Sequence, residues 1–276
     1  MWTTTRESGF TLVEMLVAFL LAGFMLTVMT GFLRASVATR HDMNLKTESQ
    51  QGVRALLEMV TQELRQAGAC LPPQGPFVAL DGADGGAQDS LTIRIGQVNR
   101  DTLTCVRGSA AAAVSSGDSA IGVYAGQGSL FDAAALVYIT DGANGEFAPV
   151  ASATDTLITL ESGLTRDYPQ NSGVYGVDER NYDIDTSSGR PILTMSIDGG
   201  TPFPLVEGVD VFNVQYLLAP CDPNCADTVN LPTDSAEWRL VREVLIDATV
   251  STRKKRRDGY ADSESGQVLV KPRNLL

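Results

Sequence analysis

The four cysteines are the residues whose types and spacing most directly suggest chemistry. They fall into two local pairs, Cys70 with Cys105 and Cys221 with Cys225. This arrangement favours disulfides, which persist in an oxidising compartment such as the periplasm or the cell exterior. A zinc site is the alternative, but it usually needs tighter Cys or His spacing, and the single histidine, His41, lies far away in a predicted helix. Four cysteines allow three connectivities, so the spacing alone leaves the pairing open.

Residues 80–89 form a second candidate site, because three carboxylates, Asp81, Asp84 and Asp89, are crowded among glycines. Such a loop could surround a hard cation such as Ca²⁺ with oxygen ligands. It lacks the closing glutamate that an EF-hand requires at its last position. A solvated loop is therefore the preferred interpretation, with a Ca²⁺ site as the alternative.

The absence of catalytic motifs argues against an enzyme, and the net charge argues against a nucleic-acid-binding protein. The sequence has no HExxH, Walker or GxSxG motif, and no histidine in its last two thirds that could serve a nucleophile. We expect no catalytic residue, no metal and no cofactor. The net charge of -12 should repel phosphate backbones. The one basic run, residues 253–257, reads as a solvated turn or strand end.

A single charge, Glu14, lies within an apolar segment that runs from Phe10 to Leu33. Roughly 24 helical residues at about 1.5 Å each span about 36 Å, enough to cross a hydrocarbon core. The segment follows a short polar start, and no small-residue cleavage site follows it, so it is not an ordinary secretory leader. A carboxylate in such a segment is expensive and predicts a functional role with a specific partner.

The helical pattern continues beyond the apolar segment. Leucines and valines recur at intervals of three, four, seven and eight as an amphipathic stripe, at Leu45, Val53, Leu56, Leu57, Val60 and Leu64. Gly68, Pro72 and Pro73 supply a stop, so we predict one helix from about Thr11 to Ala67.

Short β-like runs between turn signals follow the helix and predict a mostly antiparallel sheet. The predicted strands are residues 90–97, 135–140, 157–160, 192–197, 209–218, 242–252 and 267–271. Residues 108–120 are low in complexity and are expected to form a loop or a weak helix. The predicted fold class is α+β.

The run GFTLVE, residues 9–14, resembles the processing signal of type IV prepilins and of the pseudopilins of type II secretion. In that family a prepilin peptidase cuts after the glycine and methylates the new N-terminus. The resemblance therefore implies a cut between Gly9 and Phe10, with methylation of Phe10. It also implies that Glu14 acts in assembly by pairing with the N-terminal amine of a neighbouring subunit.

The last third of the chain narrows the resemblance. Residues 204–218, Trp238, residues 240–253 and residues 268–276 are similar to the head of PilW-type minor pilins, with the J-type pseudopilin as a close relative. This implies a pilin fold, in which a long helix packs on a β-sheet head. The expected organisation is a leader at 1–9, a helix at 10–68 whose 10–33 part is the transmembrane segment and filament core, and an extracytoplasmic head at 69–276.

The resemblance implies a protein that assembles rather than catalyses. The expected partners are other minor pilins, the major pilin and prepilin peptidase, with no nucleic acid. The expected location is the inner membrane as a single-pass precursor with a periplasmic head, and then the pilus at the cell surface. Two alternatives stay open: a J-like pseudopilin of type II secretion, and an adhesin whose residues 75–200 bind a surface or a sugar.

Overall fold

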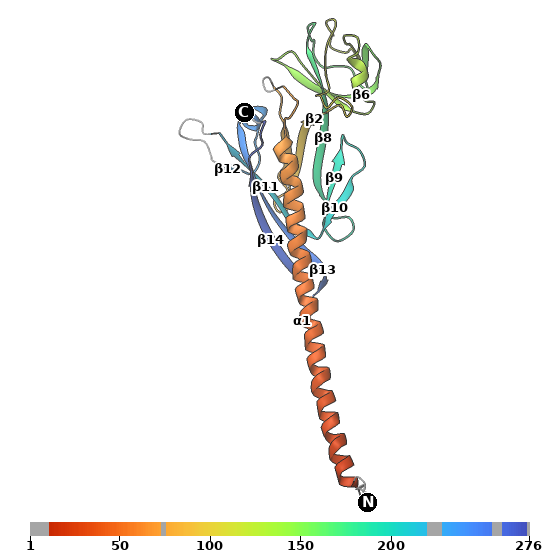
Figure 1. Ribbon diagram of the computed structural model, residues 1–276. Helices are drawn as coiled ribbons and strands as arrows, with labels where there is room; N and C mark the ends of the chain where they lie inside the picture. The colour runs from red at the N-terminus through yellow and green to blue at the C-terminus, as the bar shows by residue number, and fades with distance from the viewer. Residues whose placement is uncertain (1–10, 73–75, 220–227, 256–260, 275–276) are drawn as a thin grey trace, which may run out of the picture.

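In the computed structural model, residues 11–72, 76–219, 228–255 and 261–274 are described. The long helix α1, Leu12–Gln66, extends far beyond the β-rich head (Figure 1). It is capped by Thr11 and ends where Gly68 takes a positive φ of 75° and donates its N–H to the carbonyl of Arg94. The single helix predicted from the apolar segment and the stripe is confirmed.

The two halves of α1 have different surroundings. In the first half, the side chains from Leu12 to Leu33 are exposed, and no part of the described head covers them (Figure 1). In the second half, the predicted stripe is buried against the head at Leu45, Val53, Leu56, Val60 and Leu64, while Leu57 is half-buried. Burial of these side chains fixes the helix on the sheet.

A four-stranded antiparallel sheet packs directly on α1. Its order is β12–β11–β13–β14, so β14 is an edge strand. The strands are β11 (Val209–Leu218), β12 (Thr228–Val229), β13 (Val241–Lys255) and β14 (Ala261–Val270), with the short helix α2 (Ser235–Leu240) leading into β13. Helix and sheet approach closely at Gly266, where an added Cβ would lie 2.5 Å from a methyl carbon of Val53.

The other described strands form a second, larger antiparallel sheet with the path β1–β2–β8–β5–β6–β7–β4; β3 and β9 pair with β8, and β10 with β9. Their bounds are β1 (Leu80–Ala83), β2 (Ser90–Gly96), β3 (Arg107–Ser109), β4 (Ala120–Gly122), β5 (Leu136–Thr140), β6 (Gly145–Ala153), β7 (Leu157–Leu160), β8 (Gly173–Asp185), β9 (Ile192–Ile197) and β10 (Phe203–Glu207). A 3₁₀ turn, η1 (Gly128–Leu130), precedes β5. The predicted mostly antiparallel head is confirmed.

Within the described residues the head has two large hydrophobic cores that β8 connects, and a third, small cluster of Leu71, Tyr138 and Val177. The first half of β8 pairs with β3 and β5, and its second half pairs with β2 and β9. One core lies between α1 and the sheets. The other lies in residues 106–174, here called the distal lobe, which stands beyond the C-terminal end of α1 in Figure 1.

A polar and aromatic junction holds the distal lobe to the rest of the head. The guanidinium of Arg94 forms ion pairs with Glu179 at 2.7 Å and with Asp81 at 3.2 Å, and it lies 4.7 Å from the ring centroid of Phe147 in β6. Phe147 also contacts the ring of Tyr138 at a centroid distance of 4.9 Å. A partly buried cation thus joins β1, β2 and β8 to the distal lobe.

Two stretches differ from the expectations. The acidic stretch 80–89 is not simply a solvated loop, because its start forms β1 and Asp89 is buried, accepting backbone N–H groups of Gly85 and Val214 at 2.9 and 2.8 Å. In the low-complexity stretch 108–120, residues 110–119 form the expected loop and not a helix, but the stretch begins in β3 and ends in β4. Within the loop, Ala110 and Val114 are buried and make single β-bridges that contribute to the distal core.

Candidate assembly site

The first turn of α1 holds the predicted site residue Glu14. Its carboxylate accepts the backbone N–H of Thr11 at 3.2 Å and the hydroxyl of Thr11 at 3.1 Å. In return, the hydroxyl oxygen of Thr11 accepts the backbone N–H of Glu14 at 3.3 Å. This reciprocal capping box satisfies donors that a helix N-terminus otherwise leaves unpaired. Gly9 and Phe10, the predicted cleavage and methylation residues, lie outside the described residues.

The carboxylate of Glu14 has no counter-charge among the described residues. It is the one charged side chain between Thr11 and Leu33, and the first basic residue after it is Arg34. Within the part of the chain that the structure describes, no cation forms an ion pair with it. Because a carboxylate in an apolar environment requires compensation, a positive group would be needed beside Glu14 wherever this helix is covered by lipid or protein.

The helix surface around Glu14 is apolar on every side. Phe19, Phe24 and Phe32 each expose 70% or more of their surface, and none of the most apolar stretch of the helix is buried. Among the described residues, α1 is the helix whose length and composition would let it cross a membrane. Such a surface must be covered by lipid or by other subunits.

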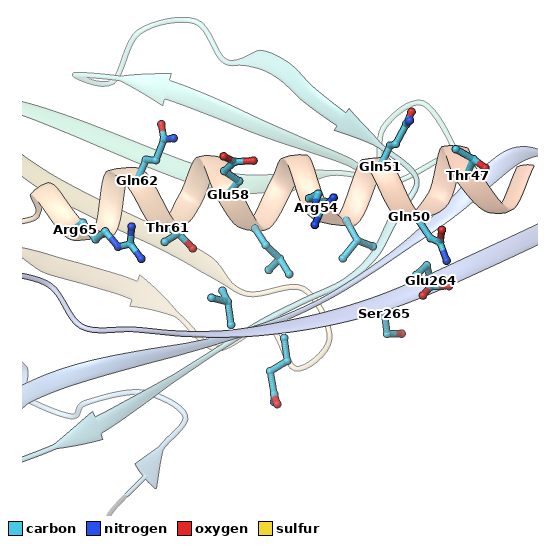
Figure 2. A pocket seen from close by; sticks show the side chains of 14 residues that line it. Thr47, Gln50, Gln51, Arg54, Glu58, Thr61, Gln62, Arg65, Glu264 and Ser265 are labelled. Atoms are coloured by element: carbon cyan, nitrogen blue, oxygen red, sulfur yellow. The ribbon is translucent and has the colours of Figure 1, made fainter. Parts of the chain in front are cut away.

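A groove runs beside the second half of α1, between that helix and the edge strand β14 (Figure 2). Its volume is about 820 Å³. Most of the residues that line it are polar, although Val53, Leu57 and Val268 contribute apolar surface. The polar residues include Gln50, Gln51, Arg54, Glu58, Gln62 and Arg65 on the helix and Glu264 and Ser265 on the strand. With acidic and basic side chains in equal number, the groove has no dominant charge and no arrangement typical of catalysis.

The cysteines and carboxylates do not form a metal centre in the described residues, where no three His, Cys, Asp or Glu side chains gather. Cys70 and Cys105 are joined by a disulfide with an S–S distance of 2.06 Å, so neither is available for zinc. Cys221 and Cys225 lie outside the described residues.

The acidic stretch 80–89 uses its carboxylates separately rather than around one cation. Asp81 pairs with Arg94, Asp84 accepts the N–H of Gly86, and Asp89 holds the backbone of β11. No shared oxygen cage remains for Ca²⁺ in this geometry.

Sequence reasoning overlooked two features of the site. The capping role of Thr11 could have been found, because Thr-x-x-Glu before an apolar run is a recognised helix-start pattern. The groove could not, because residues 47–65 and 264–268 are far apart in the chain and meet only in the fold.

Comparison with known proteins is consistent with this geometry. Residues 4–30 match the family model described as the prokaryotic N-terminal methylation motif. The match supports a type IV pilin or pseudopilin that is processed by prepilin peptidase. No curated protein matches the sequence.

Proposed function

We propose that this protein is a minor pilin, which prepilin peptidase cuts between Gly9 and Phe10 and which then joins other minor pilins in a type IV pilus. There it primes assembly or forms part of the tip complex. Three observations at the helix start carry the proposal together. The carboxylate of Glu14 forms no ion pair within the described residues, it lies on an apolar and uncovered half of the helix, and it falls inside the match to the methylation motif.

The chemistry of assembly follows from the need for a positive partner. Cleavage before Phe10 would create a new amine close to the site where Glu14 caps its own helix. In a filament, the amine of one subunit would face the carboxylate of the next. An unpaired buried carboxylate costs several kcal/mol, so only the stagger that pairs amine with carboxylate is well tolerated. Glu14 would thereby set the axial register of the subunit.

The two halves of α1 suit different parts of this role. The uncovered half of α1 would enter the filament core, while the disulfide between Cys70 and Cys105 and the packing of α1 on β13 and β14 hold the head at the filament surface. The groove in Figure 2 lies on the head-bearing half of the helix, where a neighbouring subunit would approach from the side.

A J-like pseudopilin of type II secretion is the second candidate, because the methylation motif belongs to pilins and pseudopilins alike. Both proteins would share cleavage, methylation and assembly. They differ in the filament they join and therefore in the phenotype of a deletion.

The test compares wild-type cells with cells that lack this chain. For a minor pilin, the chain is found in sheared surface filaments and its deletion lowers the number of surface pili. If pilus number is unchanged and a secreted substrate is retained in the periplasm, the pseudopilin assignment replaces it. If the chain stays in the membrane and neither phenotype appears, the assembly function is wrong.

A further inference from the structure

A polar cavity lies in the distal lobe, away from the helix surface used for assembly. Its volume is about 590 Å³, within the range of about 300–1,000 Å³ typical of small-molecule sites. Its walls come from β3, from the start of β8, from the turn after β5, and from residues 169–172. Pro72, two residues after the disulfide-bonded Cys70, closes one side.

Strand pairing sets two polar side chains beside each other at this cavity. Arg107 of β3 is directly opposite Tyr175 of β8, so both side chains stand on the same face of the sheet. The ring of Tyr175 lies over Gly173, where an added Cβ would come within 2.7 Å of a ring carbon. Because glycine has no side chain at this position, the ring of Tyr175 can lie against the wall of the cavity.

Among the side-chain donors that line the cavity and have no partner within the described residues, four bear most on the kind of ligand. Two are amide groups whose oxygens are already occupied: Gln127 accepts the N–H of Ser109 at 2.8 Å, and Asn171 accepts the hydroxyl of Tyr124 at 2.7 Å. Their NH₂ groups stay free. The other two are the guanidinium of Arg107 and the hydroxyl of Tyr175, for which no hydrogen bond or ion pair is found within the described chain.

Acceptors line the same cavity. Gln170 donates its NH₂ to the carbonyl of Ala111 at 2.8 Å, which leaves its side-chain oxygen free. Asp141 accepts the backbone N–H of Asn144, the backbone N–H of Ala143 and the side-chain NH₂ of Asn144, and these hydrogen bonds lower the pKa of its carboxyl below the ordinary value. Its negative charge balances that of Arg107, so the cavity carries donors and acceptors with no net charge.

We propose that this cavity is a binding site for a saccharide. Sugar hydroxyls both donate and accept hydrogen bonds, so they suit a cavity that offers both donors and acceptors. The donors are Arg107, Gln127, Asn171 and Tyr175, and the acceptors are Asp141 and Gln170. A phosphate or another small polyanion would be attracted by Arg107 but repelled by Asp141, so the cavity offers it no net charge attraction. An apolar ligand would leave these polar groups unsatisfied at a cost. The site does not depend on assembly, so it can be tested apart from the proposed function.

The experiment is saturation-transfer difference NMR on the full chain in micelles of a detergent without sugar groups. The probes are D-galactose, N-acetyl-D-glucosamine and D-glucuronate, with succinate as an anion that has no hydroxyls. The variants are Arg107→Ala and Tyr175→Phe. Arg100→Ala is the matched control, because Arg100 is also exposed and its removal changes the charge equally, but it lies outside the cavity.

At least one of the three sugars should bind, and Arg107→Ala should weaken it by about tenfold or more, as expected for the loss of a hydrogen bond to a charged group. Tyr175→Phe should weaken it less, and Arg100→Ala should leave it unchanged. Absence of signal for all three sugars would overturn the proposal. So would binding that Arg107→Ala and Tyr175→Phe leave intact, or succinate binding as strongly as the sugars.

Discussion

The carboxylate of Glu14 accepts the backbone N–H of Thr11 at 3.2 Å, so in the isolated chain this acidic side chain closes the start of its own helix. The same carboxylate has no cation beside it in the described residues. Capping and the proposed pairing in assembly therefore need different properties of Glu14: capping needs an acceptor oxygen, whereas pairing with an amine would need the negative charge.

Glu14→Gln separates these two demands. The amide keeps an oxygen that can accept the N–H of Thr11, but it loses the charge. We expect this variant to be made and processed normally and to fall strongly in the sheared filament fraction, measured by immunoblot against the membrane fraction.

Thr11→Ala is the matched control at the same turn. It removes the capping hydroxyl at a cost of about 1 kcal/mol to helix stability and leaves the carboxylate of Glu14 in place. Its filament fraction should stay close to that of the wild type. Equal losses for both variants would show that helix capping, not charge pairing, is what assembly requires.

Gly266 permits the close approach of β14 to α1. A valine there would place its Cβ against Val53 and Leu57, at 2.5 and 2.9 Å from their methyl carbons. We expect Gly266→Val to lower the free energy of unfolding of the head by about 1–3 kcal/mol, as overpacking usually does. The measurement is urea unfolding followed by near-UV circular dichroism of the full chain in micelles.

Gly122→Val makes the same change in another strand, at a position where no atom lies within 4 Å of the added Cβ. Its free energy of unfolding should stay within about 0.5 kcal/mol of the wild type. Equal losses for the two variants would show that the cost comes from replacing glycine in a strand rather than from helix–sheet contact.

Asp198 makes stability depend on pH. Burial, with smaller contributions from the nearby charges of Asp178 and Glu179, raises the pKa of its carboxyl from 3.8 to about 6. Between these two values the folded chain binds more protons at this group than the unfolded chain does. The contribution of Asp198 to the free energy of unfolding is therefore fully present below about pH 4 and is lost as the pH rises through about 6.

Asp198→Asn should remove this dependence. In the wild type, the backbone N–H of Glu179 donates to a carboxylate oxygen of Asp198 at 2.7 Å, and the amide oxygen of asparagine can still accept it. Asparagine also tolerates the positive φ of 51° at this position. Urea midpoints at about pH 4 and pH 7 should converge relative to the wild type, whereas the exposed control Asp101→Asn should keep the wild-type difference. An unchanged difference in Asp198→Asn would place the titrating group elsewhere.

The disulfide of Cys70 and Cys105 closes a separation of 35 residues. Changing both to serine should cost about 4 kcal/mol in the free energy of unfolding by the chain-entropy relation. The second pair, Cys221 and Cys225, remains a prediction, and its short loop should contribute about 2 kcal/mol. Non-reducing peptide mapping should recover these two links. A peptide that joins Cys70 to Cys221 or Cys225 would contradict this connectivity.

The parts of the fold that sequence could predict are those with a continuous local pattern. The apolar segment and the stripe from Leu45 to Leu64 lie along one helix, and β7, β9 and β11 have the bounds expected from their apolar runs. Glu14 was recognisable because a charge inside an apolar run is conspicuous without any tertiary information.

The central strand β8 was not predicted, because its two halves lie in different environments. Val174 faces the distal core, while Glu179 and Arg180 form ion pairs with Arg94 of β2 and Glu63 of α1. As a result, apolar and charged residues do not alternate regularly along this strand. The burial of Asp89 was equally hidden, since it depends on the backbone of Val214 far along the chain.

The most direct test of the central claim is the intact mass and N-terminal sequence of the protein from cells with and without prepilin peptidase. A mature chain that begins at N-methylated Phe10 only when the peptidase is present is the predicted result. The same uncut N-terminus in both strains would contradict the account and leave a membrane-anchored protein with a β-rich head that does not enter this assembly pathway.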